Sequence, residues 1–172
     1  MFAIRAVLAA TLGPAWGVYS GFELFEDRAV HEGSEEYLDS EKYELRPRDF
    51  AGAVAEGRSL EPFIARLNEI RREHPALQQL RDVTIHHAPD DRILVFSKKS
   101  GSDVVIVAVS LDPVWGASSQ VMLDMAALGL RSDAQFDVHD ELTGADFTWS
   151  QQAWVNLYPA QPAHILTVRG SH

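Results

Sequence analysis

Three acidic residues follow a short apolar run near the start of the chain. The run "GPAWGVYSGF" covers residues 13–22 and is followed by Glu23, Glu26 and Asp27. Carboxylates can act as a general acid and base when the fold holds two of them in a cleft. Most charged residues of loops are solvated instead. We therefore expect these three to solvate a loop and to hydrogen bond at the end of the preceding segment.

The histidines lack the spacing of metal ligands. His86 and His87 are adjacent, so in a strand they would point to opposite faces and could not bind one ion. The chain has no cysteine, which excludes thiolate metal sites and disulfide bonds. It also has no glycine-rich phosphate-binding motif. The sequence thus predicts no metal site and no cofactor, and ligand spacing is also lacking at His31, His74, His139 and His164.

Two helices are expected in the first half of the chain. Residues 2–12 form an apolar stretch that we interpret as an amphipathic helix. Residues 59–74 form a second helix, because Ser59 suits an N-cap and Pro75 removes an amide donor and ends the helix. Its apolar residues recur at the helical period of 3.6 residues and predict one buried face: Leu60, Phe63, Ile64, Leu67 and Ile70.

A buried strand of about five residues is expected between these helices, directly after the Gly-Pro break. Trp16, Val18 and Tyr19 would then be buried, and Gly17 and Gly21 would bracket the strand where backbones pack closely. A helix, a strand, a loop and a helix in this order are a slice of an α/β layered or barrel fold.

The second half of the chain is rich in short strands. Gly101 and Gly144 suit the turns of two hairpins, because glycine accepts a positive φ angle. Such a pattern predicts an antiparallel β-sandwich, joined to the first half near residues 75–83. The expected strands cover residues 92–99, 103–111, 119–125, 134–140, 153–157 and 164–168.

The charge of the chain excludes some classes of partner. Its 172 residues include 15 basic and 25 acidic side chains, for a net charge of −10. A chain this acidic is repelled by nucleic acid and by anionic membranes, and no apolar run approaches the ~18 residues that span a bilayer. With no cysteine and no cleavage site of a signal peptide, the expected location is the cytoplasm.

Several stretches together resemble one family of enzymes. The run "GPAWGVYSGFE" is similar to the signature at the eighth barrel strand of the α-amylase clan, and "DELTGADFTW", "NLYP" and "PAHILTV" are similar to the C-terminal sandwich of that clan. The stretches "GSEEYLDSEKYELRPRDF" and "LNEIRREHPALQQL" resemble the bacterial α-1,4-glucan:maltose-1-phosphate maltosyltransferases more closely. The likeness covers nearly the whole chain.

The resemblance implies a fold of α/β plus all-β class. Residues 1–80 would be the last strand and helices of a catalytic (β/α)8 barrel, and residues 81–172 an antiparallel β-sandwich. Such enzymes pass maltosyl units from maltose 1-phosphate to the non-reducing end of an α-1,4-glucan by retaining double displacement. The parent enzyme would be a homodimer and would need no cofactor.

The resemblance also implies what this portion of the enzyme contributes. The catalytic carboxylates would lie on barrel strands before residue 1, so the chain has no catalytic residue and would be inactive without the N-terminal part of the barrel. Lys42 and Tyr43 match positions that contact the donor in the family, and they are the only substrate-binding residues that we assign. The alternatives are a portion of another α-amylase-clan enzyme, such as a trehalose synthase or branching enzyme, and a non-catalytic glucan-binding sandwich module.

Three tryptophans of the sandwich region admit two interpretations. Trp115, Trp149 and Trp154 could form a platform on which sugar rings stack. In a sandwich of short strands, large aromatic side chains more often pack in the core or along a sheet edge. We expect packing for these three.

Overall fold

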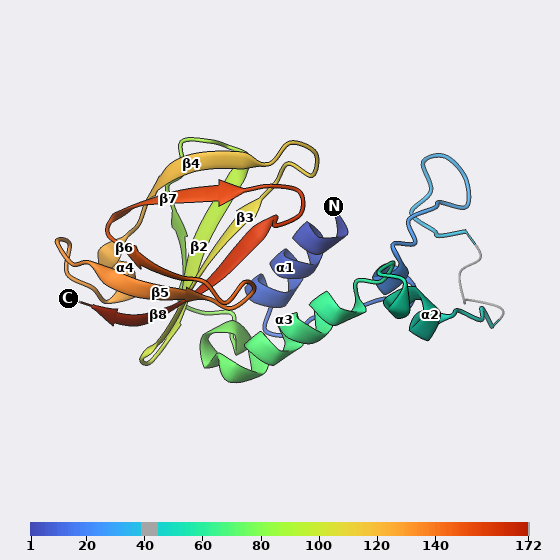
Figure 1. Cartoon of the computed structure of the whole chain (residues 1–172), viewed down its shortest axis with the longest axis horizontal. Coiled ribbons are helices and arrows are strands. Elements are labelled where there is room, and N and C mark those ends of the chain that lie inside the picture. Colours follow the sequence, from blue (N-terminus) through green and yellow to red (C-terminus); the bar gives the residue numbers. More distant parts are fainter. Residues whose placement is uncertain (39–44, 172) are drawn as a thin grey trace.

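The computed structural model describes residues 1–38 and 45–171 (Figure 1). The helices are α1 (Phe2–Leu12), α2 (Phe50–Ala55), α3 (Glu61–Glu73) and α4 (Met125–Leu128), with 3-10 turns η1 (Phe22–Leu24) and η2 (Pro75–Gln78). The strands are β1 (Val83–His86), β2 (Ile93–Ser100), β3 (Asp103–Ser110), β4 (Ala117–Met122), β5 (Phe136–Asp140), β6 (Asp146–Trp149), β7 (Gln152–Leu157) and β8 (Ala163–Ser171).

Two antiparallel sheets form the second half of the chain, as the sequence predicts. The larger sheet has the order β1-β2-β3-β8-β5-β6, and β4 pairs with β7 in the smaller one. Gly101, with φ of 62°, turns the hairpin between β2 and β3, and Gly144, with φ of 76°, turns the one between β5 and β6. The expected strand over 119–125 ends earlier, because the Asp124 side chain accepts a hydrogen bond from Ala127 N and caps α4.

The space between the two sheets is one hydrophobic core. On β7, Ala153, Val155 and Leu157 are buried while the residues between them are exposed, which is the period of two that a strand with one buried face shows. Val121 of β4, Phe136 of β5 and residues of β2, β3 and β8 complete this core.

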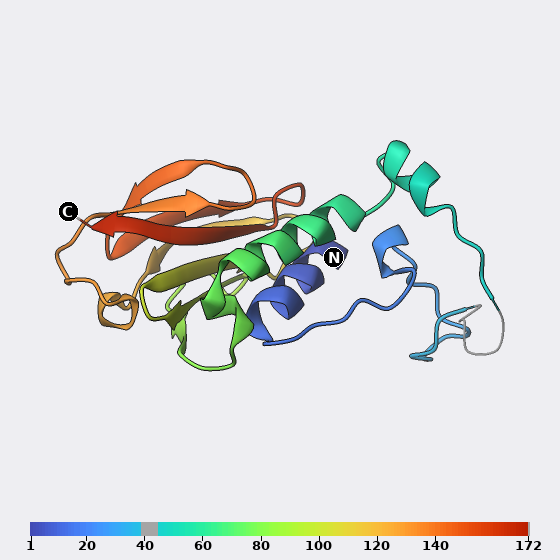
Figure 2. The same ribbon diagram turned by 90° about the horizontal axis from the view of Figure 1, so that it is seen from below.

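A second core covers the opposite face of the large sheet. Helices α1 and α3 lie side by side across that face (Figure 2). Val7 of α1 and Leu67 and Ile70 of α3 are buried there with Val107 of β3 and Ile165 of β8. The helix over 2–12 and the apolar face of the 59–74 helix are therefore confirmed. The N-cap is Leu60, one residue after the expected Ser59.

Two cations, the half-buried Arg71 and the buried Lys98, hold the end of α1 against this core. Arg71 Nη1 donates to Gly13 O at 3.0 Å, and its Nη2 donates to Pro14 O at 2.9 Å. Lys98 Nζ donates to the carbonyl oxygen of Leu12, the last residue of α1, at 3.4 Å, and to Gln79 O after η2 at 2.5 Å. The last carbonyl groups of a helix and the residues after it lack intrahelical partners, so these donors satisfy them. Burial lowers the pKa of both Arg71 and Lys98.

The expectation of a buried strand after the Gly-Pro break is wrong for this structure. Residues 13–20 form no strand, and the exposed fractions of Val18 and Tyr19 are 38% and 53%. Trp16 is half-buried, and its Nε1 donates to Asn68 Oδ1 at 3.0 Å. A strand needs hydrogen bonds from a neighbour, and among the described residues none pairs with this extended run.

Candidate functional site

The predicted donor-binding residues Lys42 and Tyr43 lie outside the residues that the structure describes. The described residues on either side of them are tied together. Arg46 Nη1 donates to Leu38 O at 3.1 Å, and Ala29 pairs with Tyr37 in an isolated antiparallel bridge. The chain before and after the predicted site is therefore anchored at one common base.

Glu26 is the centre of this base. Arg48 donates from Nε to Glu26 Oε1 at 3.0 Å and from Nη2 to Oε2 at 3.1 Å, while Arg46 Nη1 lies 3.3 Å from the same carboxylate. These hydrogen bonds from Arg48 hold the pKa of Glu26 below its usual value. Glu26 is thus an ionised acceptor with both oxygens in use, which does not suit a general acid.

The glycine at position 21 makes room for this ion pair. Gly21 has φ of 101°, and a Cβ atom there would lie 2.2 Å from Glu26 Oε2. Its N–H donates to Glu23 Oε2 at 3.1 Å. Glu23 thus makes a local hydrogen bond and Asp27 is exposed, as the sequence predicts, whereas the sequence does not predict the ion pair of Glu26 with the distant Arg48. Gly17 has open space beside it. Close packing therefore explains the glycine at position 21 but not the one at position 17.

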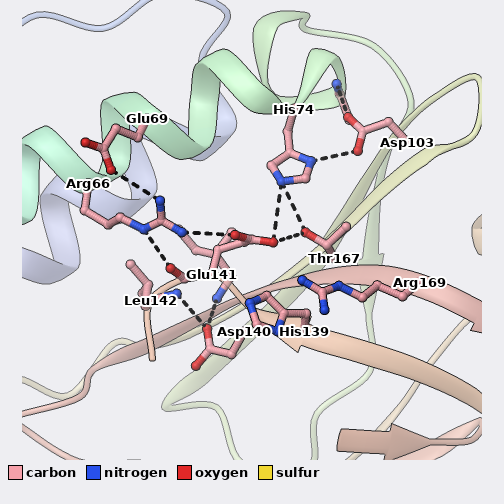
Figure 3. A network of polar contacts seen from close by, with 12 residues as sticks. Arg66, Glu69, His74, Asp103, His139, Asp140, Glu141, Leu142, Thr167 and Arg169 are labelled. Atoms are coloured by element: carbon pink, nitrogen blue, oxygen red, sulfur yellow. Dashed lines mark hydrogen bonds and ion pairs between the residues drawn. The ribbon is translucent and has the colours of Figure 1, made fainter. Parts of the chain in front are cut away.

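A partly buried polar network links α3 to the large sheet (Figure 3). His74 Nδ1 lies 2.8 Å from Asp103 Oδ1, and His74 Nε2 lies 3.2 Å from Thr167 Oγ1. Thr167 donates its hydroxyl proton to Glu141 Oε1 at 2.9 Å. Arg66 of α3 donates to both the backbone and the side chain of Glu141, at 2.9 Å and 3.0 Å. Five side chains far apart in the sequence thus meet at one place.

This network resembles a catalytic triad in its order of Asp, His and hydroxyl, but its hydrogen bonds differ. In a triad the histidine accepts the hydroxyl proton of the nucleophile. Here Thr167 gives that proton to Glu141, so His74 cannot accept it. The geometry supports a role in joining helix and sheet.

The same network contains a group of potential metal ligands. Glu73, His74 and Glu141 place one ligand atom each within 4.8 Å of one another. Both ring nitrogens of His74 already have hydrogen-bond partners, so ligation would require breaking one of these bonds. The sequence could not reveal this group, because Glu141 lies far along the chain from the other two residues.

An aromatic hollow lies on the sandwich. It has a volume of about 350 Å³ and is open to solvent. Four aromatic side chains line it: Phe147, Trp149, Trp154 and Tyr158. The predicted packing is confirmed for Trp149, which lies against the core between the sheets.

The predicted packing is wrong for the other two tryptophans. Trp154 and Trp115 have exposed fractions of 66% and 81%. The reason at Trp154 is the strand period, because its neighbours Ala153 and Val155 point into the core and Trp154 must point outward.

Two polar side chains of the hollow, Thr143 and His164, are held by one buried carboxylate. Asp140 is fully buried, and its Oδ2 accepts hydrogen bonds from Thr143 Oγ1 at 2.6 Å and His164 Nδ1 at 2.9 Å. Its Oδ1 accepts from the backbone N–H groups of Leu142 and Ile165, both at 3.2 Å. Burial alone would raise the pKa of Asp140, but these hydrogen bonds outweigh it and lower the pKa.

The fold is shared with amylase-type enzymes. The α-amylase from Geobacillus thermoleovorans superposes with a TM-score of 0.66 at 14% identity, over 98% of this chain and 33% of that one. The cyclomaltodextrin glucanotransferase CldA gives 0.65 at 18% identity, over 98% of this chain and 32% of that one. At this identity the likeness concerns the fold alone. It defines an amylase-like architecture dominated by antiparallel sheets.

Sequence comparison identifies the family within that class. Residues 85–168 match the family described as "GLGE, C-terminal". The α-1,4-glucan:maltose-1-phosphate maltosyltransferase of Mycolicibacterium smegmatis is 57% identical over 98% of this chain, and that of Corynebacterium glutamicum is 55% identical over 98%. Over nearly its whole length the chain corresponds to a C-terminal portion of such a maltosyltransferase. It spans about a quarter of the length of these relatives, 24% and 25%.

None of the described helices is long and apolar enough to cross a membrane.

Proposed function

We propose that the chain is part of an enzyme that transfers maltosyl units from maltose 1-phosphate to the non-reducing end of an α-1,4-glucan. The observation that carries this proposal is the 57% identity to a maltosyltransferase over 98% of the chain. Relatives at this level of identity are all named α-1,4-glucan:maltose-1-phosphate maltosyltransferases, which favours this reaction over the trehalose synthase and branching enzyme alternatives.

The reaction would be a retaining double displacement. That mechanism needs two carboxyl groups about 5 Å apart on either side of the scissile bond. Glu26 is committed to its arginine partners, and Glu23 accepts from the backbone, which suits neither of them to the role. We infer that the nucleophile and the acid/base are supplied by a part of the full protein outside this chain.

Residues 1–80 would complete a (β/α)8 barrel in the full protein, with residues 81–172 as its C-terminal sandwich. The extended, exposed run over 13–20 supports this inference, because Val18 and Tyr19 offer apolar surface that neighbouring barrel strands would cover. We further infer a homodimeric parent enzyme in the cytoplasm.

Lys42 and Tyr43 would bind the donor. An ammonium group offers three hydrogen-bond donors to phosphate or sugar oxygens, and a phenol offers an apolar face with a polar tip. The ion pair of Glu26 with Arg48 at the base of this loop supports the assignment, since it would fix where the loop leaves the helices.

A chimeric enzyme tests the proposal. The matching portion of the M. smegmatis relative is replaced by this chain, and phosphate release from maltose 1-phosphate is measured. We expect activity from the chimera and none from the 172-residue chain alone. An inactive but folded chimera, or phosphate release by the chain alone, would contradict the proposal.

The same chimera tests the donor site. A charge-assisted hydrogen bond contributes about 1.5–3 kcal/mol, so Lys42→Ala should lower kcat/KM for the donor by about 10- to 100-fold. Tyr43→Phe removes one hydroxyl and should cost about fivefold. Arg58→Ala is the matched control, because this exposed cation pairs with the equally exposed Glu56, and donor use should not change. Unchanged donor kinetics in both site variants would remove the assignment.

A further inference from the structure

The aromatic hollow exposes several large aromatic side chains to solvent. Trp154 is 66% exposed, Tyr158 46% and Phe147 39%. All three lie around one concave surface with Trp149, and exposed apolar patches on a soluble protein mark interaction sites. Flat aromatic faces are suited to ligands that are themselves flat and partly apolar.

The hollow continues past Trp154. A second depression of about 320 Å³ lies against the same Phe147, Trp149 and Trp154, with Gln135 and Gln152 at its border. These three aromatic side chains therefore line both depressions, which adjoin one another. An elongated ligand could cross the indole ring and occupy a depression on either side, which a single small molecule could not do.

The lining carries no formal charge in a chain that is otherwise acidic. Among the residues that the structure describes, no Lys, Arg, Asp or Glu side chain lines the first hollow, although the chain has a net charge of −10. Its polar groups are the hydroxyl of Thr143, the amides of Asn156 and Gln161 and the ring of His164. Neutral donors and acceptors beside aromatic faces match a neutral polyhydroxylated ligand with apolar ring faces.

These polar groups are also held in place before any ligand arrives. Asp140 fixes Thr143 and His164, and Tyr158 Oη donates to Gln161 Oε1 at 2.7 Å. When polar groups are oriented before the ligand binds, less conformational entropy is lost on binding. The hollow thus has the apolar faces, the polar rim and the rigidity of a binding site.

We propose that this hollow binds a segment of an α-1,4-glucan, with a sugar ring stacked on Trp154 and the chain continuing into both depressions. The aromatic and uncharged polar side chains of the lining indicate a neutral sugar chain as the ligand. The choice of the α-1,4 linkage rests on the proposed function. The site would hold a glucan on the sandwich and would be separate from the donor contacts proposed for Lys42 and Tyr43.

The test is an NMR titration of the 15N-labelled 172-residue chain with maltoheptaose. We expect saturable shifts in residues 143–164, and tighter binding of maltoheptaose than of maltose, because the longer chain reaches both depressions. Trp154→Ala should weaken binding by about tenfold or more, as expected for the central aromatic residue of a site. Its exposure means that the fold should survive, which the spectrum itself verifies.

Trp115→Ala is the matched control, because Trp115 is 81% exposed and does not line the hollow. Its affinity for maltoheptaose should equal that of the unaltered chain. The proposal is overturned if maltoheptaose causes no saturable shift, if the shifts lie elsewhere, or if the two tryptophan variants lose affinity equally. Equal affinity for cellohexaose would overturn the α-1,4 linkage.

This experiment can fail independently of the proposed function. If maltoheptaose does not bind here while Lys42→Ala still lowers donor use in the chimera, only the sandwich site is wrong. If the chimera is inactive while neutral sugar chains still bind at Trp154, only the proposed reaction is wrong.

Discussion

The packed body and the outer segment of this molecule are built on different principles. The packed body comprises residues 1–12 and 59–171, where helices and sheets bury two continuous cores. The outer segment comprises the described residues 26–38 and 45–58, which extend away from the sandwich beyond α3 (Figures 1 and 2). Side chains of the outer segment meet mainly in polar contacts around Glu26.

The difference shows where stability and the proposed donor chemistry reside. Burial of apolar side chains is the main source of folding free energy, and nearly all of it lies in the packed body. Loops held by a rigid scaffold more often carry binding residues. The positions proposed to bind the donor fall within the span of the outer segment, whereas the proposed glucan site lies on the packed body.

A matched pair of leucine substitutions would test this difference most strongly. Leu67→Ala removes a side chain that is 1% exposed between α3 and the sheet, whereas Leu45→Ala removes one that is 93% exposed. The first should lower the free energy of unfolding by about 2–5 kcal/mol, and the second by less than about 0.5 kcal/mol. Urea unfolding measures both. Similar losses in the two variants would break the comparison.

Asp140→Asn should have the next largest effect. Asp140 is fully buried and accepts four hydrogen bonds, so we expect a loss of about 1–3 kcal/mol at neutral pH. Asp133→Asn is the control, because Asp133 pairs with Arg131 in solvent and should matter little.

The effect of Asp140 should depend on pH with a defined sign. Its pKa is lower in the folded chain than the usual value, so its contribution is complete above the ordinary aspartate pKa of about 3.9 and is lost as the pH falls through the folded value. The gap in stability between Asp140→Asn and the unaltered chain should therefore narrow in acid. A gap that widens below pH 4 would show that the carboxylate has a different role.

Glu26→Gln should have the smallest effect on global stability. In the ion pair with Arg48, the Arg48 side chain is 4% exposed and the Glu26 side chain 23%, but the outer segment contributes to neither hydrophobic core, so its local opening should leave global stability almost unchanged. Changes in NMR shifts should be confined to the outer segment and to Ser20 and Gly21. Spread of the changes into the strands, with a large loss of stability, would mean that the two regions unfold as one unit. Glu56→Gln, at an exposed pair, is the control.

The sequence predicts the packed body well for a physical reason. The apolar period of 3.6 in the 59–74 helix and the alternation in the strands are properties of each element alone, so they identify the buried face without knowledge of the partner. The antiparallel sheets were expected on this basis and are confirmed. The outward direction of Trp154 could also have been read from its alternation with Ala153 and Val155.

The conformation of residues 13–20 and the polar network around His74 could not be predicted, because both depend on partners distant in the sequence. The run over 13–20 has the composition of a buried strand, but a strand also requires a neighbour, and here Val18 and Tyr19 are exposed. The polar network around His74 joins Asp103, Glu141 and Thr167, and no local sequence pattern predicts these contacts. The donor assignment of Lys42 and Tyr43 came from resemblance to a family and stays a prediction.

Native-state amide exchange, followed residue by residue, tests the contrast between the two regions most directly. We expect amides in α1, α3, β2, β3 and β8 to be protected by at least about a thousandfold, because they open only when the cores open. Amides of residues 26–38 and 45–58 should exchange through local opening with little protection. Similar protection across the packed body and the outer segment, or exchange in α1 and α3 as fast as in the outer segment, would contradict the account.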